Sequence, residues 1–142
     1  MIATFKKILV PVDDSEYSRK ALRYVLGLAQ ANKAHVALLH CFAHIPLLIG
    51  GEPRKELLAD MVREAEKLLA PYAKALREIG VEPALIIKEG RAGDVIVQEA
   101  QTGSYELIVM GSRGLSNLEG LFMGSEAQRV LALAPCPVLI IR

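Results

Sequence analysis

The sequence predicts an α/β fold built on a five-stranded parallel sheet, and three observations support that prediction. Short apolar runs typical of buried strands alternate with segments in which apolar residues recur at helical spacing. Glycine, proline and aspartate mark most of the boundaries between these segments. The resulting order is β-α-β-α-β-α-β-α-β. Such an alternation favours a parallel sheet with helices on both faces and right-handed crossovers.

Length and composition indicate one globular domain over residues 1–142. The chain has 142 residues, 52% of them hydrophobic and 23% charged, which is long enough and apolar enough for one substantial core. Only three Phe, four Tyr and no Trp are present, so we expect an aliphatic core without an aromatic surface for stacking bases. The net charge is +1 without a basic run, which argues against a nucleic acid or a membrane surface as partner.

The sequence also predicts a cytoplasmic protein. No apolar stretch reaches the roughly 18 residues of a membrane span, and the amino-terminal residues do not follow the pattern of a signal peptide. Cys41 and Cys136 lie far apart and form no Cys-x-x-Cys pair. We therefore expect reduced, core-like thiols, with neither a disulfide nor a metal site.

The first half of the chain predicts two strands and two helices. Residues 8–12 are an apolar run that Pro11 brings to an end, and residues 13–15 offer caps for a helix that extends to about Asn32. Residues 34–42 read as a central strand. The apolar loop 43–53 has two interpretations, a flap over a ligand or a contact surface. Helical spacing then predicts a helix over 54–79.

The second half of the chain completes the alternation. Pro71 predicts a kink or brief break in the long helix, because proline cannot donate the i→i−4 hydrogen bond. Residues 82–89 predict a third strand, followed by a short helix that ends at Gly103. Residues 106–110 and 137–141 predict the fourth and fifth strands.

Between those last two strands, residues 109–125 run from a strand through a glycine-containing loop to a helix. Backbone N–H groups and a helix amino terminus can hold an anion in this arrangement, most often a phosphate. Two other interpretations remain open. The glycines can be ordinary turn residues, and Ser125 with Gln128 can form a capping box that uses the serine locally.

Two common phosphate motifs are excluded in this stretch. No Gly-Lys-Ser/Thr closes the loop, so it is not a P-loop. Three closely spaced glycines after the first strand are also missing, so it is not the dinucleotide-binding fingerprint.

The stretch does resemble the universal stress protein family. The nucleotide-binding branch of that family carries Gly-x2-Gly-x9-Gly-Ser/Thr here, and Gly111, Gly114, Gly124 and Ser125 match it in spacing. Residues 7–15 are similar to the family's first strand and turn, and residues 134–141 to its last strand. Together these motifs cover essentially the whole chain.

This resemblance implies a fold, a ligand and a set of binding residues. The fold is the Rossmann-like fold of the adenine-nucleotide α-hydrolases, with sheet order 3-2-1-4-5, which places Asp13 beside Gly111. The ligand is ATP, or AMP or ADP, with Mg²⁺ or Mn²⁺ as a possible companion. The implied nucleotide-binding residues, with phosphates on the glycine stretch and adenine and ribose on the others, are Pro11, Val12, Asp13, Cys41, Met110, Gly111, Ser112, Arg113, Gly114, Gly124, Ser125 and Glu126. From the residues alone, Asp13 also reads as a turn or cap acid, which is the commoner role for such a residue.

The resemblance also implies a homodimer through the last strand, Val138–Ile141. Pairing with a second copy would cover an apolar strand that otherwise forms an exposed sheet edge.

Glu126 departs from the family pattern, because nucleotide-binding relatives usually have a small or aliphatic residue there. A carboxylate in the first helical turn suits the helix dipole but competes with terminal phosphates for it. We expect a penalty on ATP relative to AMP unless a metal ion screens Glu126 or the side chain turns to solvent.

Three functions follow from these observations. The first is a nucleotide-binding stress-response module. The second is a slow ATP hydrolase, against which no base is clearly placed near residues 111–125. The third is a non-nucleotide scaffold, the other branch of the same family. The complete glycine pattern favours the first function, and we assign no catalytic residue.

Overall fold

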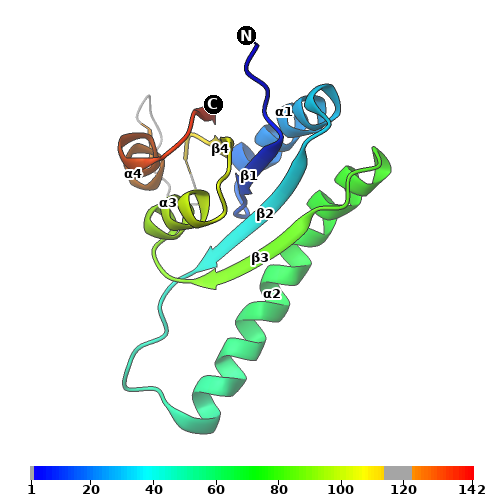
Figure 1. Cartoon of the computed structure of the whole chain (residues 1–142). Helices are drawn as coiled ribbons and strands as arrows, with labels where there is room; N and C mark the ends of the chain where they lie inside the picture. The colour runs from blue at the N-terminus through cyan, green and yellow to red at the C-terminus, as the bar shows by residue number, and fades with distance from the viewer. Residues whose placement is uncertain (1, 114–122) are drawn as a thin grey trace.

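The computed structural model describes residues 2–113 and 123–142, and strands and helices alternate along these ranges (Figure 1). The elements are β1 Lys7–Pro11, α1 Glu16–Asn32, β2 His35–Phe42, α2 Gly51–Glu78, β3 Ala84–Glu89, α3 Ala92–Thr102, β4 Leu107–Gly111, α4 Ser125–Leu133 and β5 Val138–Ile141.

The strands form one sheet in the order β3-β2-β1-β4-β5, and all four neighbouring pairs are parallel. This confirms the predicted fold class and strand order. The chain moves from β1 toward one edge through β2 and β3, and then returns to the other side of β1 with β4 and β5. Strand order therefore reverses between β1 and β4. In open α/β sheets, ligands bind at the carboxyl ends of the strands where such a reversal occurs.

The sheet has a packed core on each face, because successive strand residues point to opposite sides. In β1, Ile8 and Val10 belong to the core beneath α1 and α2, whereas Leu9 belongs to the core that contains residues of α3 and α4. In β4, Leu107 and Val109 belong to the first of these cores, and Ile108 and Met110 belong to the second. Figure 1 shows the two helix pairs on the two sides of the sheet.

The long helix begins at Gly51 rather than at residue 54. Of the kink or brief break predicted at Pro71, the break does not occur, because the helix continues through this residue. Pro71 is exposed, and so is Lys67, whose carbonyl would have accepted the missing i→i−4 hydrogen bond. Water can satisfy that carbonyl, which lets the helix tolerate the proline. The predicted strand boundaries differ from the observed ones by at most two residues.

The loop between β2 and α2 is anchored by an ion pair at its base. The N–H group of Ile45, a buried residue, donates to Glu89 Oε1 at 2.8 Å, and Arg54 Nη2 lies 3.2 Å from the same oxygen. Leu47 and Leu48 at the loop's tip are almost fully exposed. Among the described residues, none of loop 43–50 lines the cavity described below, so the flap interpretation finds no support.

We predict that Glu89→Gln lowers the melting temperature at pH 7 and has little effect at pH 3. The Ile45 N–H hydrogen bond, followed by the charge of Arg54, holds the pKa of Glu89 below its ordinary value. A carboxyl group with a depressed pKa stabilises the fold above its unfolded-state pKa, and this stabilisation is lost as the pH falls through the folded-state pKa. Thermal melts of the two proteins at both pH values test this, and an equal difference at pH 3 would contradict it.

The two edges of the sheet are β3 and β5. Val138, Leu139 and Ile140 of β5 are half-buried, and Ile141 is buried. Within the described ranges, no helix is both long and apolar enough to cross a membrane.

Candidate functional site

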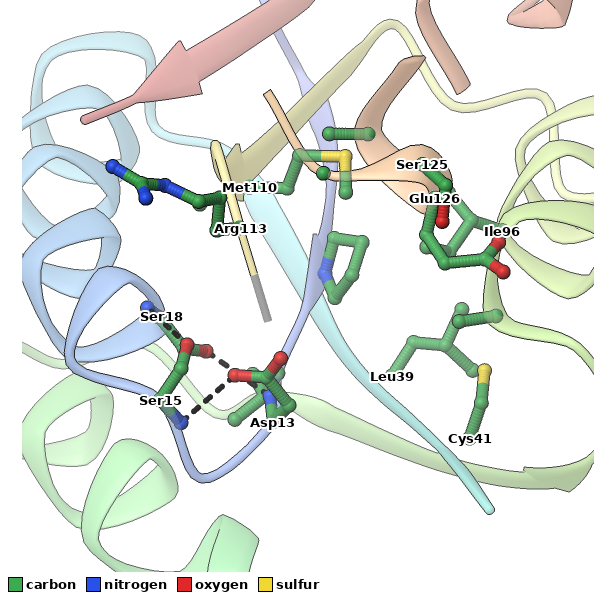
Figure 2. Close-up of a pocket in the computed structure, with 16 residues that line it drawn as sticks. Asp13, Ser15, Ser18, Leu39, Cys41, Ile96, Met110, Arg113, Ser125 and Glu126 are labelled. Atoms are coloured by element: carbon green, nitrogen blue, oxygen red, sulfur yellow. Dashed lines mark hydrogen bonds between the residues drawn. The ribbon is translucent and has the colours of Figure 1, made fainter. Parts of the chain in front are cut away.

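A cavity of about 350 Å³ opens at the carboxyl ends of the strands, where β1 and β4 diverge (Figure 2). Ten of the twelve residues predicted from the sequence line it: Pro11, Val12, Asp13, Cys41, Met110, Gly111, Arg113, Gly124, Ser125 and Glu126. Ser112 is buried behind the wall instead, and its N–H donates to the Ile141 carbonyl at 2.7 Å. Gly114 lies outside the described residues.

One side of the cavity is the turn between β1 and α1. Asp13 Oδ1 accepts the N–H of Ser15 at 2.9 Å, and the N–H of Asp13 donates to Ser18 Oγ at 3.1 Å. Ser15 is the N-cap of α1, because its side chain accepts the N–H of Ser18 at 3.1 Å. These bonds, drawn in Figure 2, fix Asp13 beside the cavity. Asp13 therefore stabilises this turn, as the turn-acid interpretation expected. It also lines the cavity, which a contact with the ribose of a ligand requires.

Gly111 allows β4 to approach the amino end of α1 closely. A Cβ atom on Gly111 would lie 2.6 Å from the Tyr17 Cβ and 2.9 Å from the Tyr17 carbonyl carbon. Both distances are well inside van der Waals contact, and the second involves rigid backbone. Glycine is thus required here for close packing, and that packing brings the end of β4 beside the Asp13 turn.

Arg113 also lines the cavity, and its side chain lies toward α1. Its guanidinium is 5.0 Å from the centre of the Tyr17 ring, within the range of a cation–π contact. Figure 2 shows the side chain extending toward α1. In this conformation the guanidinium is displaced from the middle of the cavity, although the residue still contributes to its wall.

Helix α4 begins beside the residues that follow β4, and its amino terminus lies at the cavity. Gly124 is the N-cap and provides no side-chain hydrogen bond, and its N–H donates to the Ser112 carbonyl at 2.8 Å. The capping-box interpretation of Ser125 and Gln128 is wrong. Ser125 is the first helical residue rather than the N-cap, and Gln128 Nε2 donates instead to the Met123 carbonyl at 2.7 Å.

Glu126, which also lines the cavity, is bonded to the neighbouring helix. Its Oε1 accepts Arg91 Nε at 2.9 Å, and its Oε2 accepts the N–H of Gly93 in the first turn of α3 at 2.7 Å. The carboxylate therefore caps α3 rather than standing free, an arrangement that the sequence alone did not suggest. Hydrogen bonding to Glu126 and its negative charge raise the pKa of Arg91.

The remaining wall is apolar. It includes Leu39 of β2, Cys41 of the same strand, Ile96 of α3 and Met110 of β4. Figure 2 shows Leu39, Cys41 and Ile96 across the cavity from the Asp13 turn. The sequence did not mark Leu39 or Ile96 as site residues, because an aliphatic residue in a strand or helix looks the same whether it packs in the core or lines a cavity.

Cys41 is expected to be a slow nucleophile. Burial, followed by the negative charges of Glu126 and Glu99, raises the pKa of its thiol to about 12. Because only the thiolate reacts, we predict that a Cys136→Ser variant is alkylated by iodoacetamide at pH 7.5 at least about a hundredfold more slowly than free cysteine. Mass spectrometry of quenched time points measures the rate. Alkylation at the rate of free cysteine would contradict the prediction.

The acids of this site are hydrogen-bonded within the protein. Among the described residues that line the cavity, the acids are Asp13 and Glu126, and both accept hydrogen bonds from neighbouring backbone. His40 lies nearby, but its Nδ1 is 2.8 Å from the Val12 carbonyl. The arrangement offers an apolar wall, two carboxylates and a helix amino terminus.

The chain is similar to known proteins along nearly its whole length. Residues 4–142 match the model of the universal stress protein family. A universal stress protein from Thermus aquaticus, encoded in the QAH/OAS sulfhydrylase 3′ region, is 38% identical over 138 residues, which cover 97% of this chain and 99% of that protein. The structure of MJ0577, a universal stress protein of Methanocaldococcus jannaschii, has a TM-score of 0.86 at 30% identity and covers 98% of this chain and 96% of that chain.

More distant structures share the fold and contain nucleotides. A universal stress protein from Archaeoglobus fulgidus in complex with dAMP has a TM-score of 0.73 at 24% identity, covering 99% of this chain and 100% of that chain. Complexes of universal stress proteins with cAMP and with AMP have TM-scores of 0.77 and 0.69. The fold is thus that of the adenine-nucleotide α-hydrolase-like proteins. With a family match across nearly the whole length, the chain belongs to the universal stress protein family.

Proposed function

We propose that this protein binds an adenine nucleotide in the cavity between β1 and β4 and acts as a stress-response binding module rather than as an enzyme. One observation carries this proposal: ten of the residues predicted to bind a nucleotide line the same cavity. Related structures that contain dAMP, AMP or cAMP support the same ligand class.

The cavity's polarity matches the parts of a nucleotide. The apolar wall of Leu39, Cys41 and Ile96 suits a purine base, because binding sites hold such rings mainly by apolar contact. Asp13, which lines the cavity, would accept hydrogen bonds from ribose hydroxyl groups. The amino terminus of α4, from Ser125 onward, suits phosphate, since the N–H groups of a first helical turn and the helix dipole favour an anion there. ATP is one member of this ligand class, and Mg²⁺ or Mn²⁺ would accompany its polyphosphate.

Denaturing freshly purified protein and separating the released small molecules by ion-exchange chromatography tests the proposal. We expect an adenine nucleotide, or tight binding of added AMP or Mg-ATP by protein that is purified empty. Gly124→Trp provides a matched variant: its Cβ would make only ordinary contacts, 3.4 Å from the Arg113 Cα, while the indole would fill the cavity mouth. An empty wild-type protein that binds neither nucleotide would leave the non-nucleotide scaffold as the function.

The proposal includes a homodimer through β5. Val138–Ile141 pairs with β4 along one side, and an apolar sheet edge of this kind favours pairing with another strand. Multi-angle light scattering at micromolar concentration is expected to give twice the 15.5 kDa mass of the chain. A monomer would contradict this part of the proposal alone.

A further inference from the structure

We infer that the ion pair between Arg91 and Glu126 sets how many phosphates the site accepts, which makes Arg91 a specificity-determining residue outside the cavity wall. This inference rests on the proposed nucleotide function and deepens it. Neither composition nor motif spacing singled out Arg91, whose partner lies 35 positions later in the chain.

The pair holds a negative charge at a fixed place in the wall. Glu126 is the second residue of α4, and both of its carboxylate oxygens are bonded to the α3 side, to Arg91 and to Gly93. Gly93 is suited to this contact, because a Cβ at that position would lie 2.5 Å from Glu126 Oε2. The carboxylate therefore cannot swing to solvent without giving up two hydrogen bonds, and it stays at the end of the cavity where phosphates would be held.

Arg91 compensates that charge. Its side chain is 54% exposed, while the side chain of Glu126, which lines the cavity, is 36% exposed. With the pair intact, the wall presents a nearly neutral ion pair beside the α4 amino terminus. Without Arg91, the remaining carboxylate would repel each additional phosphate charge. Without the Glu126 charge, Arg91 would be available to attract those phosphates. Because the groups are partly exposed, water and salt moderate both effects.

A second ion pair between the same two helices provides a matched control. Arg129 of α4 bonds to Asp94 of α3, and neither residue lines the cavity. Loss of this pair alters the α3–α4 contact without changing the charge in the wall. A merely structural role for Arg91 and Glu126 would make all three substitutions behave alike.

The test compares the dissociation constants of AMP and ATP by isothermal titration in metal-free buffer at low salt. The variants are Arg91→Gln, Glu126→Gln, the double variant and Arg129→Gln. We expect Arg91→Gln to weaken ATP relative to AMP by about three- to fivefold, and Glu126→Gln to strengthen it by a similar factor. The double variant should return close to the wild-type ratio. Arg129→Gln should leave the ratio unchanged, and every shift should shrink as salt is added.

Shifts of the same sign in Arg91→Gln and Glu126→Gln, ratios that change by less than about twofold, or an equal shift in Arg129→Gln would overturn the inference. Thermal melts identify a variant that fails to fold, and in that case Arg91→Met and Glu126→Leu, which remove the same charges, repeat the comparison. If the proposed function itself is wrong, the same titrations will show that wild-type protein binds neither AMP nor ATP.

Discussion

Gly111→Ala is expected to destabilise the protein by about 1–3 kcal/mol, the usual cost of forcing an extra carbon into a close-packed site. The new Cβ would lie 2.6 Å from the Tyr17 Cβ and 2.9 Å from the Tyr17 carbonyl carbon. The backbone of α1 cannot rotate away as a flexible side chain can, so β4 and α1 must separate. Urea denaturation at 25 °C measures the change in the free energy of unfolding.

Gly27→Ala is the matched control. Gly27 lies exposed in the interior of α1, and a Cβ there would meet nothing within 4 Å. Alanine is the better helix former, so this substitution should stabilise the protein by about 0.5–1 kcal/mol. Equal effects of the two substitutions would contradict the assignment of Gly111 to close packing.

Asp13→Asn is expected to weaken AMP binding about 10- to 100-fold, because a hydrogen bond to a charged group contributes roughly 1.5–3 kcal/mol. The melting temperature should change little. The asparagine side-chain oxygen can still accept the Ser15 N–H that Asp13 Oδ1 accepts at 2.9 Å, so the turn is retained. Isothermal titration of both proteins measures the loss.

A ligand without ribose hydroxyl groups distinguishes a direct contact from a general electrostatic effect. Wild-type protein should bind AMP more tightly than the 2′,3′-dideoxy analogue, and Asp13→Asn should lose most of that preference. If the variant retains the full preference, the ribose contact assigned to Asp13 is wrong.

Much of this fold could be predicted from local sequence. The apolar runs and helical periods located each strand and helix of residues 2–113 and 123–142, since burial demands those patterns. The strand order could not be obtained in that way, because periodicity does not say which strands are neighbours; here it came from the family resemblance. Of the kink or brief break predicted at Pro71, the break does not occur, because a solvent-facing proline costs a helix less than a buried one would.

The site was less completely predictable. Asp13 and the glycine stretch carry a recognisable pattern, and the structure brings them to one cavity. Leu39 and Ile96 have no such mark, because apolar residues of core and cavity look alike in sequence. The partners of Glu126 were also hidden. Arg91 and Gly93 meet it only because α3 and α4 pack on the same face of the sheet.

A second hollow offers the main competing place for an anionic ligand. It has a volume of about 440 Å³ and lies between α1 and the end of β5. Lys20, Arg23 and Arg142 line it together with Tyr24 and Ile141. A nucleotide that bound there through charge alone would satisfy a simple affinity measurement without using the cavity between β1 and β4.

The most direct test is therefore an amide-resolved NMR titration of the ¹⁵N-labelled protein with AMP. We expect the largest chemical-shift changes on the amides of the residues that surround the cavity between β1 and β4, namely Val12, Asp13, Gly111, Ser125 and Glu126. Changes centred on Lys20, Arg23 and Arg142, or no changes at millimolar AMP, would contradict this expectation.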